Sequence, residues 1–143
     1  MRIVLLAVML AASLLASARD ESLSDLQARA ESARTEDKAP IYIEIAHFQL
    51  RDADKLYNDG NVEQARKDVE DVVAFSRQAS DAAIKSKKHM KDTEIAARKM
   101  AEKLRDIKRT LNLEDQPPLD AAIKLLEDIR TELLAAMFRK EKK

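Results

Sequence analysis

The sequence predicts an all-α protein, an elongated antiparallel helical bundle organised on one long central helix at about residues 62–111. The first observation is that the 143 residues include one Gly and three Pro, which leaves few turns for a sheet. The second is a seven-residue repeat of uncharged positions, typical of a long amphipathic helix. These positions are Val62, Ala65, Val69, Val72, Ser76, Ala79, Ala83, Ser86, Met90, Thr93, Ala97, Met100, Leu104, Ile107 and Leu111.

The length of this helix leaves one alternative open. A continuous helix over 62–111 would be about 75 Å long at 1.5 Å per residue. The weakest place is 87–94, where Asp92 or Thr93 could cap a new helix. We expect continuity, because the uncharged positions pass through 87–94 without a shift in register.

Shorter helices are predicted on both sides of the central one. The segment at about 40–57 starts at Pro40, after a polar break, and stops at Asn58–Asn61, where Gly60 can adopt a left-handed conformation. The segment at about 117–138 opens with Pro117-Pro118 and has a broad apolar face. We expect 40–57 to pack on the front half of the central helix and 117–138 on its rear half.

The N-terminal residues have the pattern of an export signal. A basic start and an apolar run precede the small residues Ala16-Ser17-Ala18, so we expect a signal peptide at 1–18. Residues 19–38 then form a linker or a marginal helix at about 22–34, and 39–143 form a single helical domain. The sequence therefore predicts a periplasmic or secreted protein with no membrane anchor after signal cleavage.

Composition and charge exclude several classes of function. The chain has 26 Lys and Arg against 26 Asp and Glu and has no Trp, which argues against nucleic-acid binding by a basic field or by base stacking. It has no Cys, so thiol chemistry and disulfides are excluded. His47 lies between apolar residues and His89 among lysines, and neither spacing is that of a metal site. We expect no catalytic, cofactor-binding or metal-binding residues and no enzymatic activity.

One short segment resembles a known family. In residues 53–69, Leu56, Gly60 and Ala65 stand where the helical hairpin of a tetratricopeptide repeat has its Leu, its turn Gly and the Ala at the helix crossing. No second full copy follows at the 34-residue period of that family. The resemblance implies a tight helical hairpin and, for the family, a role in binding a partner protein.

The function predicted from these features is protein–protein interaction through a coiled-coil-like surface, as in an adaptor, an assembly factor or a holdase-like protein. The expected contact is the seam, defined here as Ser76, Ala79, Ala83, Ser86, Met90 and Thr93. Two alternatives remain open. One is a bundle that binds a small apolar molecule, haem or a metal, and the other is a homodimer formed through the same seam.

Overall fold

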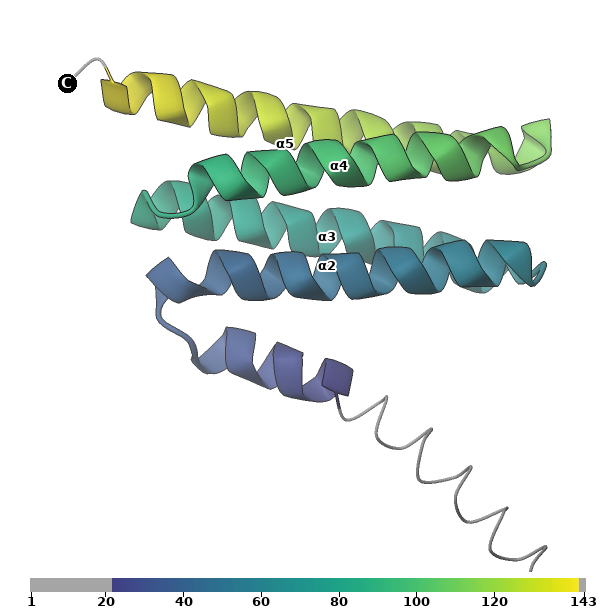
Figure 1. Cartoon of the computed structure of the whole chain (residues 1–143), viewed down its shortest axis with the longest axis horizontal. Coiled ribbons are helices and arrows are strands. Elements are labelled where there is room, and N and C mark those ends of the chain that lie inside the picture. Colours follow the sequence, from purple (N-terminus) through teal and green to yellow (C-terminus); the bar gives the residue numbers. More distant parts are fainter. Residues whose placement is uncertain (1–21, 142–143) are drawn as a thin grey trace, which may run out of the picture.

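The chain folds into helices that run side by side, as the computed structural model shows for residues 22–141 (Figure 1). The all-α class is confirmed, and the described residues contain no strand. A helical segment at 22–32 comes first. It is followed by α2 (Thr35–Asn58), α3 (Val62–Ser86), α4 (Met90–Arg109), the short 3-10 turn η1 (Leu113–Asp115) and α5 (Pro117–Glu141).

The long central helix is the expectation that the structure corrects. The range 62–111 holds two antiparallel helices, α3 and α4, joined by a tight reversal at residues 87–89. Lys87 and His89 both have left-handed backbones, with φ of 59° and 66°. The register of uncharged positions is unshifted because the reversal returns both halves of the pattern to the same core. The predicted rod of about 75 Å is therefore replaced by helices of about half that length.

The start of α2 is a second correction. The helix begins at Thr35 and not at Pro40, which lies inside it. A proline here removes one early backbone hydrogen bond. The first turn is supported by acidic Glu36 and Asp37, which pair with Arg34 at 3.0 Å each and lie favourably at a helix N-terminus.

Two predicted helix boundaries are confirmed. Helix α2 ends just before Gly60, and α5 begins at Pro117. Gly60 has a φ of 82°, and the hydrogen bonds from Asn61 N to Leu56 O (2.8 Å) and from Gly60 N to Tyr57 O (3.1 Å) form the two-bond C-terminal cap that favours glycine. Pro117 is the first residue of α5, where a missing N–H costs nothing. The expected packing of α2 on α3 and of α5 on α4 is also confirmed.

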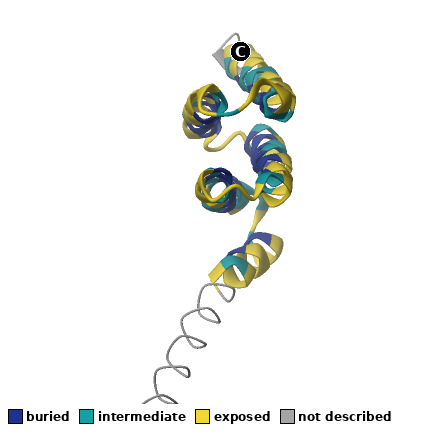
Figure 2. Cartoon of the chain, turned by 90° about the vertical axis from the view of Figure 1, so that its right-hand side faces the viewer, coloured by how far each residue is buried: buried dark blue, intermediate teal, exposed yellow. Residues whose placement is uncertain are grey.

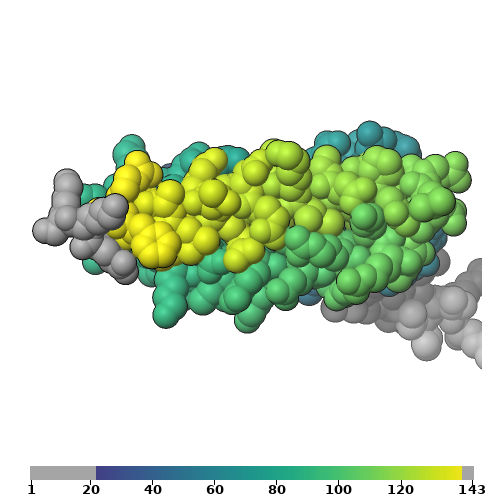
Figure 3. Space-filling view, turned by 90° about the horizontal axis from the view of Figure 1, so that it is seen from above, coloured from purple at the N-terminus to yellow at the C-terminus, as the bar shows by residue number. Residues whose placement is uncertain are grey.

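The helices form two layers, which are seen end-on in Figure 2. Helices α2 and α4 lie in one layer and α3 and α5 in the other, so the molecule is a stack of two hairpins, α2–α3 and α4–α5. The segment at 22–32 packs below the first hairpin through a small cluster of Leu26, Ala30 and Ile45. At the opposite edge α5 is outermost (Figure 3), and its outward residues include the ion pair Lys124–Asp128 at 3.2 Å. The exposed residues of α5 also include three large apolar side chains, Leu125, Leu134 and Phe138.

The two hairpins bury corresponding positions 54 residues apart. Leu50-Arg51-Asp52 in α2 recurs as Leu104-Arg105-Asp106 in α4. Both leucines are buried, and so are the members of the pairs Ala46 and Met100, Ala53 and Ile107, Ala65 and Leu119, Val72 and Leu126, and Ala79 and Leu133. In each of these five pairs the first hairpin has the smaller residue, whereas Leu50 and Leu104 are identical.

Ion pairs tie the second hairpin together and to the first. Arg130 of α5 contacts Glu94 of α4 at 2.9 Å and Glu127 of its own helix at 2.8 Å. Arg105 of α4 also contacts Glu127, at 3.0 Å. Glu94 is buried, so its charge requires this partner. A further pair, Arg77–Glu132 at 2.7 Å, joins α3 to α5.

Candidate functional site

The seam predicted as a contact surface is used inside the molecule. Five of its residues, Ser76, Ala79, Ala83, Met90 and Thr93, are buried, and Ser86 is half-buried. The reversal at 87–89 turns the seams of α3 and α4 into the core, where Ser76 Oγ donates to Val72 O (2.6 Å) and Thr93 Oγ1 to His89 O (2.7 Å). The seam is thus closed to a partner protein or to a second copy, and the expected contact surface is corrected.

The hairpin-crossing residues lie where the sequence predicted a close approach of α2 and α3. Ala65 is fully buried, Leu56 is half-buried against the core, and Gly60 lies in the turn. A small side chain at Ala65 lets the two helices pack tightly just after the turn. These residues shape the hairpin and leave no open site at the crossing.

A groove between α2 and α4 carries positive charge. It has a volume of about 220 Å³ and is lined by His47, Leu50, Arg51, Asp54, Lys99, Met100 and Lys103. Lys103 pairs with Asp54 at 3.0 Å. Among the described residues, neither Arg51 nor Lys99 has a carboxylate within ion-pair distance. The groove therefore offers uncompensated cations to an anionic group.

His47 shows the effect of these charges. It is half-buried in the groove, and burial lowers its pKa, with the charges of Arg51 and Lys99 lowering it further. The imidazole is therefore neutral at pH 7 and can both donate and accept a hydrogen bond. Sequence reasoning placed His47 at the edge of an apolar face and missed the cations that α4 brings to it.

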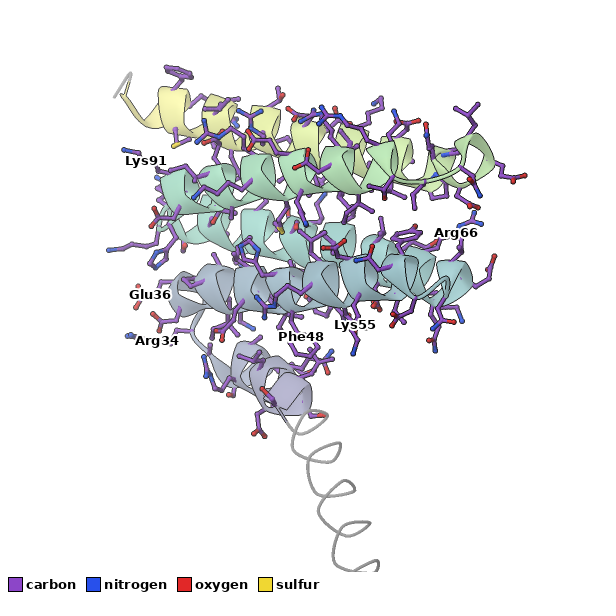
Figure 4. The ribbon with its side chains drawn as sticks, turned by 45° about the vertical axis from the view of Figure 1, so that its right-hand side comes forward. Arg34, Glu36, Phe48, Lys55, Arg66 and Lys91 are labelled. Carbon is purple, nitrogen blue, oxygen red and sulfur yellow. The ribbon has the colours of Figure 1, made fainter. Side chains whose placement is uncertain are left out.

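A larger cavity lies where the segment at 22–32 meets the first hairpin. Its volume is about 530 Å³, within the range typical of small-molecule sites. Seven residues line it: Leu23, Phe48, Gln49, Arg51, Asp52, Lys55 and Asp68. Figure 4 shows Phe48 and Lys55 projecting from α2 on the side where the segment at 22–32 lies.

Two carboxyl groups meet at this cavity. Burial, a hydrogen bond with Asp52 and the charges of Asp52 and Asp71 raise the pKa of Asp68 to about 7. Asp68 Oδ2 is buried and has no hydrogen-bond partner among the described residues. At neutral pH the two carboxyls therefore tend to share a proton, as close carboxylates do.

Gln49 adds an unsatisfied amide to the same cavity. Its side chain is only 7% exposed, yet it makes no hydrogen bond with the described residues. The amide atoms are not among the buried unpaired atoms of the described chain, so they are open to the cavity and available to a ligand or to water. The sequence contains one signal of it, a lone polar residue between Phe48 and Leu50 in an apolar stretch. The approach of Asp68 to Asp52 had no such signal, because the two lie on different helices.

Residues 22–141 contain neither a group of side chains suited to a metal ion nor a helix suited to crossing a membrane. The structure gathers no group of three or more His, Cys, Asp or Glu that could hold a metal ion in this range. Among the same residues, no helix has both the length and the apolar character needed to cross a membrane. No family model, curated protein or solved structure matches the chain.

Proposed function

We propose that this is an exported, non-enzymatic helical protein that binds an acidic segment of a partner protein in the groove between α2 and α4. The observation that carries the proposal is the pair of uncompensated cations, Arg51 and Lys99, which line the groove together with half-buried His47. Export rests on the signal-like pattern of residues 1–18.

The chemistry of the groove selects the class of partner. Its floor includes apolar Leu50 and Met100, and its rim carries Arg51, Lys99 and Lys103. An extended segment with carboxylates flanking an apolar side chain complements both features. A groove of this size takes a few side chains only, which suits an adaptor that recognises a short exposed segment.

Binding of labelled peptides tests this function. We expect a short peptide of alternating Glu and Leu to raise fluorescence anisotropy with the wild-type protein, and the matched peptide of Gln and Leu to bind at least tenfold more weakly. Arg51→Glu/Lys99→Glu is expected to weaken binding of the acidic peptide by about tenfold or more, because the double variant reverses two charges at the groove.

A matched pair of lysines provides the control. Lys67→Glu/Lys85→Glu makes the same change of net charge on exposed positions of α3, in the other layer. Equal weakening by the two double variants would show that binding follows net charge, and the groove would lose its assigned role. Absence of binding by the acidic peptide would refute the partner class.

A further inference from the structure

The cavity at the segment 22–32 shares one lining residue, Arg51, with the α2–α4 groove but has a different chemistry. Its lining comprises a carboxyl pair (Asp52 and Asp68), an amide (Gln49), two cations (Arg51 and Lys55) and the apolar side chains of Leu23 and Phe48. We propose that this cavity binds a free amino acid with an apolar side chain. The carboxyl pair would take its ammonium group and Lys55 its carboxylate.

The ammonium end follows from the carboxyl pair. Asp52 and Asp68 line the same cavity, and Asp68 Oδ2 is buried without a partner among the described residues. A ligand ammonium replaces the shared proton with one positive charge and several donors, which satisfies both carboxylates. A charged donor of this kind forms stronger hydrogen bonds than a neutral one.

The carboxylate end follows from Lys55. This residue stands one helical turn beyond Asp52 on α2 and lines the same cavity, and no carboxylate of the described chain lies within ion-pair distance of it. Figure 4 shows Lys55 on the same side of α2 as Phe48. A positive group close to an acidic pair disfavours a simple cation and favours a ligand with both charges.

The other lining residues provide a hydrogen-bonding amide and an apolar surface for the ligand. Gln49 can donate to the ligand carboxylate or accept from its ammonium, because its side chain makes no hydrogen bond with the described residues. Phe48 and Leu23 supply apolar surface for the ligand side chain. The volume of about 530 Å³ accommodates a ligand of this size.

Nuclear magnetic resonance of the whole protein tests the proposal through the side-chain amide of Gln49. L-leucine, L-methionine and L-phenylalanine are each titrated to about 10 mM at pH 8, and at least one is expected to shift the Gln49 amide signals with saturation. Two fragments then separate the charges. Phenethylamine lacks the carboxylate of L-phenylalanine, 3-phenylpropionate lacks its ammonium, and each is expected to bind at least about fivefold more weakly.

Variants locate the site. Asp52→Asn/Asp68→Asn is expected to weaken amino-acid binding by about tenfold or more, and Lys55→Met by about fivefold. The pair Asp81→Asn and Lys85→Met, on exposed positions of α3, is the matched control and should leave binding unchanged. Thermal melts followed by circular dichroism show that each variant is folded.

Three results would overturn the proposal. One is that none of the three amino acids shifts Gln49 at about 10 mM. Another is that the Asp52→Asn/Asp68→Asn variant binds as well as wild type. The third is that phenethylamine binds as tightly as L-phenylalanine, since the ligand would then be a simple amine.

Discussion

At the scale of single residues, Asp68 shows how the fold sets the chemistry of a side chain. Its carboxyl is held near Asp52 of another helix and near Asp71 of its own. The sequence shows many alternating acids and bases, and nothing marks these two acids as neighbours. Only the crossing of α2 and α3 brings them together, which is why the pair could not be predicted.

The raised pKa of Asp68 makes stability depend on pH in a defined direction. The folded protein keeps the proton up to about pH 7, whereas the unfolded chain loses it near the ordinary value of 3.8. The folded state therefore binds more protons between these values, and the free energy of unfolding falls as the pH rises through this window. Below the window the penalty is absent.

Asp68→Asn should remove this penalty. At pH 8 we expect the variant to be more stable than wild type by about 1–2 kcal/mol, a value that allows for solvent screening of a half-buried pair. At pH 4 the difference should nearly vanish, because the wild-type carboxyl is then neutral. Urea unfolding at several pH values measures this. Asp81→Asn, exposed on the same helix, should show no such trend, and a variant less stable than wild type at pH 8 would contradict the argument.

At the scale of elements, the reversal between α3 and α4 decides the fold. A continuous helix would have left the small side chains of the seam exposed, whereas the reversal buries Met90, Ala97, Met100 and Leu104 as well. Each left-handed residue costs about 1–2 kcal/mol, and burying one large apolar side chain contributes about 1.5–3 kcal/mol. The burial therefore outweighs the strain at Lys87 and His89.

The elements that the sequence predicted well are those with local stop signals. Gly60 ends α2 because glycine permits a left-handed backbone, and Pro117 starts α5 because proline fixes φ at a helical value. The reversal at 87–89 has neither Gly nor Pro. Its position is set by packing of distant helices, and a periodic pattern of uncharged residues is the same for one long helix and for two that fold together.

His89→Gly should stabilise the protein because glycine adopts a φ near 66° without steric strain. The hydrogen bonds from Thr93 N and Oγ1 go to the backbone oxygen of His89 and are retained. We expect a gain of about 0.5–1 kcal/mol in the free energy of unfolding, the relief of strain being partly offset by the greater freedom of the unfolded chain.

Denaturant midpoints of His89→Gly and of Lys88→Gly give the comparison. Lys88 lies in the same turn without a positive φ, so glycine there brings entropy loss and no relief. A gain for both variants would show that the benefit is not specific to the left-handed backbone of His89. A loss for His89→Gly would show that its left-handed backbone is not strained.

At the scale of the whole molecule, two hairpins and one added segment make up the described chain. Apart from the recurring Leu-Arg-Asp, the correspondence at 54 residues was not visible as sequence similarity, because it consists mostly of shared burial between residues of different size. The segment at 22–32 has no counterpart in the second hairpin and is held by the cluster of Leu26, Ala30 and Ile45. It nevertheless forms one wall of the larger cavity through Leu23.

Leu26→Asp should therefore detach the segment while the two hairpins stay folded. Leu26 is 8% exposed, and a charge there would have to be buried against Ile45. Amide hydrogen exchange should lose protection at 22–32 and keep it in α4 and α5, which make no part of this cluster. Gln27→Asp, exposed on the same turn, is the control and should leave protection unchanged.

The same variant separates the two proposed sites. Detachment removes the Leu23 wall, so amino-acid binding at the cavity should weaken, while the acidic peptide at the α2–α4 groove should bind as before, since no residue of 22–32 lines that groove. Loss of protection throughout the chain would mean that the segment and the hairpins unfold as one unit. If both ligands lost binding equally while the amides of α4 and α5 stayed protected from exchange, the two sites would be coupled through α2, the helix that lines both.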